Sequence, residues 1–147
     1  MAYIKIAPYN APSAWKAGAT LVLPGVNDIA AINPYLISGN QVEFGPGTIV
    51  NPKGSGDGII WVYEKTNLLI TGQGPSTIFN IAGWYISNVN QFDIGGFNMA
   101  GNIGGAEPWS SIFIGATVNG SGVYVHDIYS DQKGGHHFYV YAVGPSI

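Results

Sequence analysis

The densest group of ionisable side chains in the sequence lies near its C-terminal end and comprises His126, Asp127, Asp131, His136 and His137. Imidazole and carboxylate groups on successive turns of one chain could serve as general acid and base in glycoside hydrolysis. A metal site, built from the two adjacent histidines and an aspartate, is a second interpretation. In a third, the aspartates are turn residues, and the adjacent histidines point to opposite sides of a strand.

We expect the third interpretation, and therefore neither a bound metal nor a cofactor. If the chain is nevertheless an enzyme, its candidate catalytic residues are Asp127, Asp131, His136 and His137.

A second group of residues is aromatic and alternates with aliphatic residues in predicted strands. If the aliphatic neighbours face inward, the aromatic residues form an outward column with two flanking tyrosines: Trp61, Tyr85, Phe113 and Tyr139, with Tyr63 and Tyr141 beside them. A strip of this size is too apolar to be left bare on a soluble monomer. Three coverings remain open: other copies of the chain, sugar rings stacked on Trp61 and Tyr85, or the N-terminal segment that contains Tyr3, Tyr9 and Trp15.

Composition narrows the class of protein. The 147 residues suit a single domain, here residues 1–147. Only 9% of residues are charged and 46% are hydrophobic, but the apolar runs, residues 59–63 among them, are strand-sized, so no membrane span is expected. The net charge of −3 and the absence of a basic cluster argue against nucleic acid as a partner.

Two further absences bear on location. The sequence has no cysteine, so neither disulfides nor thiolate metal sites are available. Residues 1–6 show no signal-peptide pattern. An extracellular protein would then need a virion or a non-classical export route.

One helix is predicted, over residues 27–37. Asn27 is placed to cap its first turn, and Ile29, Ile32 and Leu36 fall on one face. Pro34 should distort and shorten it.

The remaining sequence predicts short strands in three interleaved series. The first series starts at residues 42, 68, 92 and 123, the second at 48, 77, 97 and 128, and the third at 60, 84, 112 and 138. Recurrence of three strands every 24 to 31 residues predicts an all-β solenoid of about four coils, a parallel β-helix. An antiparallel sandwich, the structural competitor, has no such common period.

The first series also predicts specific positions. Leu68, Phe92 and Val123 should stack inward, and Asn67 and Asn90 should form left-handed turns before their strands. The outward column of this series is expected to be Glu43, Leu69, Asp93 and Tyr124. Its two acids would lie two strands and about 10 Å apart. That separation is too large for one calcium ion.

Four segments within residues 11–80 carry a family resemblance: APSAWKAGA at 11–19, GVNDIAAI at 25–32, VEFGPGT at 42–48 and NLLITGQGPST at 67–77. In this order they resemble the opening of pectate-lyase-like proteins from phage tails and microbial surfaces. The resemblance implies a right-handed parallel β-helix, with residues 1–40 as leader and capping helix and residues 41–147 as coils. The family contains lyases, hydrolases and inert shafts, so its fold does not specify a function.

Lyases of this family use a Lys or Arg base and calcium held by clustered acids, but this chain has no arginine and no close acid pair in the expected column. The resemblance therefore favours a structural or receptor- and glycan-binding module of a phage tail spike or a cell-surface fibre. The alternative is a small polysaccharide-degrading enzyme. Residues 142–147, which follow the last predicted strand, are too few for a capping helix, so we expect a homotrimer, end-to-end stacking or a downstream domain to cover the last coil. An extracellular or virion-surface location would accompany this role.

Overall fold

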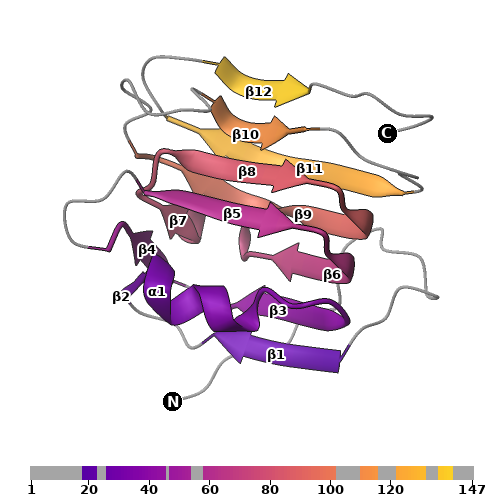
Figure 1. The fold of residues 1–147 in the computed structure, drawn as a ribbon. Coiled ribbons are helices and arrows are strands. Elements are labelled where there is room, and N and C mark those ends of the chain that lie inside the picture. Colours follow the sequence, from indigo (N-terminus) through magenta and orange to yellow (C-terminus); the bar gives the residue numbers. More distant parts are fainter. Residues whose placement is uncertain are drawn as a thin grey trace.

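Strands dominate the computed structural model, which describes residues 18–22, 26–45, 47–53, 58–101, 110–115, 122–131 and 136–140 (Figure 1). The strands are β1 (Gly18–Val22), β2 (Val26–Asp28), β3 (Asn40–Phe44), β4 (Ile49–Asn51), β5 (Ile59–Tyr63), β6 (Thr66–Thr71), β7 (Ile78–Phe79), β8 (Gly83–Ser87), β9 (Asn90–Met99), β10 (Ser110–Ile114), β11 (Val123–Ser130) and β12 (His136–Val140). The helical elements are α1 (Ile29–Ile32) and two short 3-10 turns, η2 (Asn33–Tyr35) and η3 (Gly74–Ser76). The predicted all-β class is confirmed. Within the described ranges, no helix is long and apolar enough to cross a membrane.

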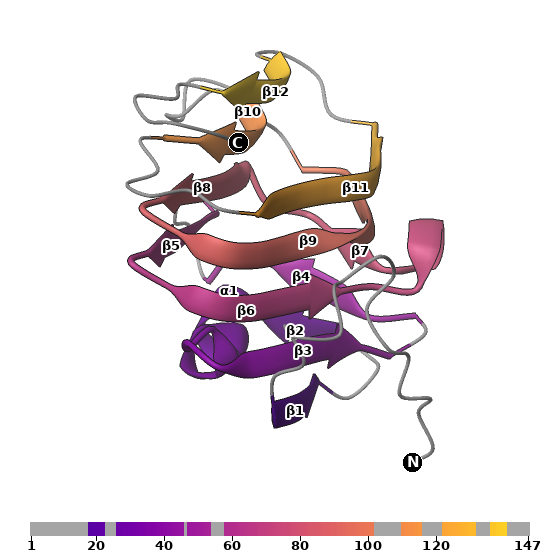
Figure 2. The same cartoon turned by 90° about the vertical axis from the view of Figure 1, so that its right-hand side faces the viewer.

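The strands form two sheets in which every described pair is parallel. The larger sheet has the order β1-β3-β6-β9-β7-β4-β2, with β11 paired to β9, and the smaller has the order β12-β10-β8-β5. The larger sheet curls because β9 pairs with both β6 and β7, and the two views at right angles show strands from successive parts of the chain stacked in order (Figures 1 and 2).

The second and third strand series are aligned as the sequence predicts. Residues 60, 84, 112 and 138 lie opposite one another in the smaller sheet. Residues 49, 78, 98 and 129 do so in the larger sheet. The first series is offset at its start, because Val42 lies opposite Ile70 rather than Leu68. A shift of two residues leaves the inward face unchanged but moves each outward residue into the next column.

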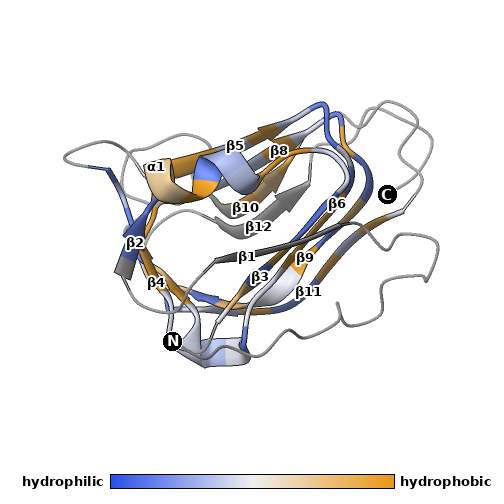
Figure 3. Ribbon diagram, turned by 90° about the horizontal axis from the view of Figure 1, so that it is seen from below, coloured by the Kyte–Doolittle hydropathy of each residue, from blue (hydrophilic) through white to orange (hydrophobic). Residues whose placement is uncertain are grey.

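The core lies between the two sheets, which enclose it when the stack is viewed from below (Figure 3). The predicted inward stack is confirmed, since Leu68 pairs with Phe92 and Phe92 with Val123, all of them buried. Large rings fill the space beside them: the Phe79 ring centroid lies 4.7 Å from that of Phe97. Burial of a Phe side chain contributes roughly 2–3 kcal/mol.

Left-handed residues recur at one aligned position of the larger sheet. Residues 39, 67, 91 and 122 are aligned at the starts of β3, β6, β9 and β11, and all have positive φ: Gly39 (84°), Asn67 (56°), Gln91 (50°) and Gly122 (79°). The prediction for Asn67 is correct. The prediction for Asn90 is wrong. Asn90 lies opposite Thr66 rather than Asn67, and the left-handed residue is Gln91.

The helix is shorter than predicted and has a different cap. The Ala31 amide donates to Asp28 Oδ1 at 2.9 Å, so Asp28 rather than Asn27 is the N-cap. The helix ends at Ile32, and Pro34 lies in the 3-10 turn that follows. The predicted apolar face is buried, and α1 lies below β5 at the start of the stack (Figures 1 and 3).

Candidate functional site

Strands β5, β8 and β10 place three aromatic rings in one column on the outer face of the smaller sheet. Trp61 lies opposite Tyr85, and Tyr85 lies opposite Phe113. Alternation of side chains along β5 buries Ile60 and Val62 and directs Trp61 outward. Ring centroids are 4.7 Å apart for Trp61 and Tyr85, and 4.5 Å for Tyr85 and Phe113.

Tyr63 widens the column at the β5 end. Its ring is stacked on Trp61 at 5.8 Å and lies 5.7 Å from Tyr85. Trp61 and Tyr63 are 49% and 46% exposed, whereas Tyr85 and Phe113 are partly buried. Burial, and then the nearby Tyr85, raise the pKa of the Tyr63 hydroxyl above its ordinary value.

Two predicted members of the column are less fully defined. The Tyr139 backbone pairs with Phe113 in register, but its side chain lies outside the described part of the structure, as does all of Tyr141. The aromatic column, as far as the structure describes it, therefore consists of the rings of Trp61, Tyr63, Tyr85 and Phe113.

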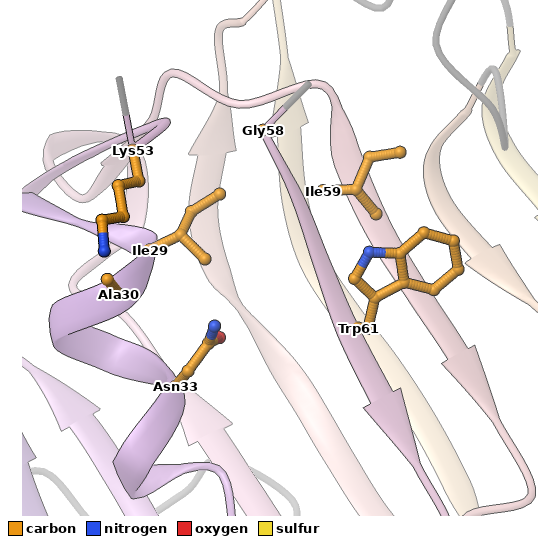
Figure 4. Close-up of a pocket in the computed structure, with 7 residues that line it drawn as sticks. All are labelled: Ile29, Ala30, Asn33, Lys53, Gly58, Ile59 and Trp61. Atoms are coloured by element: carbon orange, nitrogen blue, oxygen red, sulfur yellow. The ribbon is translucent and has the colours of Figure 1, made fainter. Parts of the chain in front are cut away.

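A pocket of about 310 Å³ opens at the Trp61 end of the aromatic column, between α1 and β5 (Figure 4). Its lining is Ile29, Ala30, Asn33, Lys53, Gly58, Ile59 and Trp61. The pocket exists because α1 takes the place below β5 that a strand of the smaller sheet would otherwise fill (Figure 1).

Polar groups converge on this pocket from both sides. Lys53 lies on the α1 side, and Trp61 lies across the pocket with its indole nitrogen turned inward (Figure 4). The Asn33 side chain lies between them, at the end of α1. Sequence reasoning missed Lys53 and Asn33, because no local pattern shows that the helix packs below β5.

A second cluster lies on the larger sheet, around His126. His126 Nε2 is 2.7 Å from Asp93 Oδ1, and His126 Nδ1 is 3.0 Å from Asp127 Oδ2. The imidazole ring lies over Gly95, its partner in the neighbouring strand. A Cβ atom at position 95 would collide with the His126 carbonyl oxygen and come within 2.7 Å of the imidazole ring, so only glycine fits beside His126.

The His126 cluster has perturbed proton affinities. Burial raises the pKa of Asp93, which is fully buried, although the hydrogen bond and charge of His126 oppose this shift. Burial lowers the pKa of His126, but hydrogen bonds to Asp127 and Asp93 outweigh it and raise the pKa overall. The charged imidazolium form of His126 can donate to both carboxylates. The two carboxylates therefore favour the charged form of His126 over the neutral one.

The expected outward column of the first series needs correction. Gln41, not Glu43, shares a column with Leu69 and Asp93, because of the two-residue offset. Glu43 lies in the next column, is buried, and accepts a hydrogen bond from Gln41 Nε2. Leu69 and Asp93 are also fully buried rather than exposed.

The candidate catalytic aspartates bond to different groups. Asp127 has φ of 49°, a left-handed turn conformation, and accepts from His126. Asp131 accepts from Asn98 Nδ2 at 3.0 Å. The structure describes the backbone of His136 and His137 on β12 but not their side chains.

Sequence reasoning missed the Asp93–His126 contact, although a signal for it was present. The predicted strand series aligns Asp93 with Tyr124. His126 follows Tyr124 by two residues, so the two side chains point to the same side of their strand. Diagonal neighbours of this kind are within reach of a long side chain. Among the described residues, no group of three or more His, Cys, Asp or Glu could hold a metal ion.

No protein-family model, curated protein or solved structure matches the chain. Function must therefore be inferred from the aromatic column, the pocket at its end and the His126 cluster.

Proposed function

We propose that this chain is a carbohydrate-binding module with a right-handed parallel β-helix fold, of the pectate-lyase-like type found in phage tail spikes and microbial surface fibres. Support for the fold comes from three parallel strand series, from left-handed residues that recur at one aligned position of the larger sheet, and from the segments of residues 11–80 that resemble the family. The role implies a location on a virion or outside a cell.

The observation that carries the binding role is Trp61. Its ring is half exposed, forms the end of the aromatic column and lines the pocket. A pyranose ring has an apolar face of C–H groups that packs on an aromatic ring, and hydroxyl groups that need polar partners. Trp61 supplies the first requirement, and Lys53 and Asn33 supply the second.

Self-association is the competing explanation of the exposed rings, through a homotrimer or end-to-end stacking. The cores of protein interfaces are depleted in charged residues, especially Lys. A lysine across the pocket from Trp61 therefore suits a hydrated ligand better than the centre of a subunit interface. The two roles are compatible if subunits meet along Tyr85 and Phe113 and leave the Trp61 end open.

Replacing Trp61 with Ser tests the proposal. We expect binding to a polysaccharide panel to fall at least tenfold, while the molecular mass in solution is unchanged. Tyr129→Ser is the matched control, because Tyr129 is 45% exposed but lies on β11, on the larger sheet. Loss of the oligomer without any sugar binding in the parent protein would show that the rings form an interface instead.

A small polysaccharide-degrading enzyme remains the second candidate, favoured by the Asp93–His126 hydrogen bond. A buried acid that orients a partly exposed histidine is an arrangement used for general bases. Release of reducing ends from a polysaccharide, abolished by His126→Gln, would support this candidate. No release by the parent protein would refute this candidate, and unchanged release in the variant would show that His126 is not the general base.

A further inference from the structure

The polar groups that line the pocket between α1 and β5 are rich in hydrogen-bond donors. Lys53 has an ammonium group with three N–H donors, Trp61 has one indole N–H, and Asn33 has an amide with both donor and acceptor atoms. Among the residues that the structure describes, no carboxylate lines the pocket. Its ligand should therefore present acceptors and negative charge.

These donors are also unused within the part of the chain that the structure describes. Lys53 forms no salt bridge with a described residue, since the ion pairs there both involve His126. The side chains of Asn33 and Trp61 likewise have no hydrogen bond to a described residue. Donors that converge on a pocket without protein partners are expected where a ligand supplies the acceptors.

The size and floor of the pocket limit the ligand further. Ile29, Ala30 and Ile59 provide an apolar floor, so part of the ligand must itself be apolar. The volume of about 310 Å³ is near the lower end of the range for small-molecule sites, roughly 300–1,000 Å³. That space suits one or two sugar rings rather than a long segment of polysaccharide.

We infer that this pocket binds an anionic sugar unit, a pyranose that carries a carboxylate or a sulfate, with its ring against Trp61 and its charge at Lys53. The inference rests on the proposed carbohydrate-binding function and adds the class of sugar. Lys53 is exposed, so its contribution should be moderate and should weaken with salt.

The test compares oligosaccharides that differ only in charge. A β-1,4-linked glucuronic acid oligosaccharide and a cello-oligosaccharide of the same length share a backbone and differ in the C6 carboxylate. A 6-sulfated cello-oligosaccharide separates sulfate from carboxylate. Calorimetry gives the affinity, and the NMR signal of the Trp61 indole N–H reports whether the pocket is occupied.

We expect the better of the two anionic oligosaccharides to bind about five- to tenfold more tightly than the neutral one at about 0.15 M salt. Lys53→Gln should remove that advantage, because it weakens binding of the anionic oligosaccharide more than binding of the neutral one. Lys65→Gln is the matched control, since Lys65 lies in the turn after β5 and does not line the pocket. At about 1 M salt, where the screening length is about 3 Å, the advantage should also disappear.

Equal affinity for charged and neutral oligosaccharides, with no effect of Lys53→Gln, would overturn the inference and leave the proposed function intact. Failure of every oligosaccharide to bind or to shift the Trp61 signal would overturn both. Thermal unfolding of each variant shows whether a loss of binding reflects a loss of folding.

Discussion

His126 reaches Asp93 across Gly95, where a Cβ atom would collide with both the backbone and the ring of His126. The contact joins β11 to β9 and leaves Asp93 Oδ2 buried without a partner in the described part of the chain. A buried carboxyl group that has only one partner depends strongly on it, because removal of that partner leaves the whole group unsatisfied. His126 is therefore a stabilising residue whatever its role in function.

The first prediction concerns the pH dependence of this pair. The folded-state pKa of His126 is raised, so its contribution to stability is fully present below the unfolded value of about 6.5. That contribution is lost as the pH rises through the folded pKa. The raised pKa of Asp93 acts in the same direction, because ionising a buried carboxyl group costs stability as the pH rises.

We therefore expect His126→Ala to lower the free energy of unfolding by about 2–3 kcal/mol near pH 6. The loss should be smaller near pH 9, and urea titrations at the two pH values measure it. Asp127→Asn serves as the control, with an effect below about 1 kcal/mol, because Asp127 is 55% exposed. A constant difference between parent and His126→Ala from pH 6 to 9 would contradict the linkage.

Among the elements, the left-handed residues at the starts of β3, β6, β9 and β11 decide the direction in which each of these strands begins. Each turn needs a residue with positive φ at the aligned position, because parallel strands must leave the turn in the same direction. Gly39 and Gly122 adopt this conformation without strain, and Asn67 tolerates it. Gln91 has no such preference, so its turn stores backbone strain of roughly 1 kcal/mol.

The second prediction follows from that strain. Gln91→Asn should raise the free energy of unfolding by about 0.5 kcal/mol, because asparagine is better suited to the left-handed region. Asn90→Gly is the contrasting variant: Asn90 is a strand residue in the structure, so glycine there should destabilise by about 0.5–1 kcal/mol. Chemical denaturation distinguishes these signs. A stabilising Asn90→Gly would instead favour the turn position inferred from sequence.

At the scale of the molecule, binding and catalysis place different demands on the surface. The aromatic column and its pocket lie on the smaller sheet, whereas the buried acids Glu43 and Asp93 lie on the larger one. Proton abstraction by a lyase needs a base and charge stabilisation at one solvent-accessible place. The two buried acids occupy different columns and do not provide such a place.

The third prediction is that the protein releases no unsaturated sugar from polygalacturonate or alginate, and that calcium has no effect. Ultraviolet absorbance of the reaction mixture, with and without a chelator, provides the measurement. Calcium-dependent release would contradict the binding role proposed for the aromatic column.

The sequence by itself determined the all-β class, the period of the strand series and the direction of Trp61, Tyr85 and Phe113. These properties depend on local alternation and on repetition along the chain, which the sequence records directly. The tertiary structure decided the two-residue offset of β3, the turn at Gln91 and the burial of Glu43. It also decided the pocket between α1 and β5 and the His126–Asp93 contact. Both bring together residues that are distant in sequence. Such contacts depend on how strands from different parts of the chain stack, and no single segment of the chain encodes that.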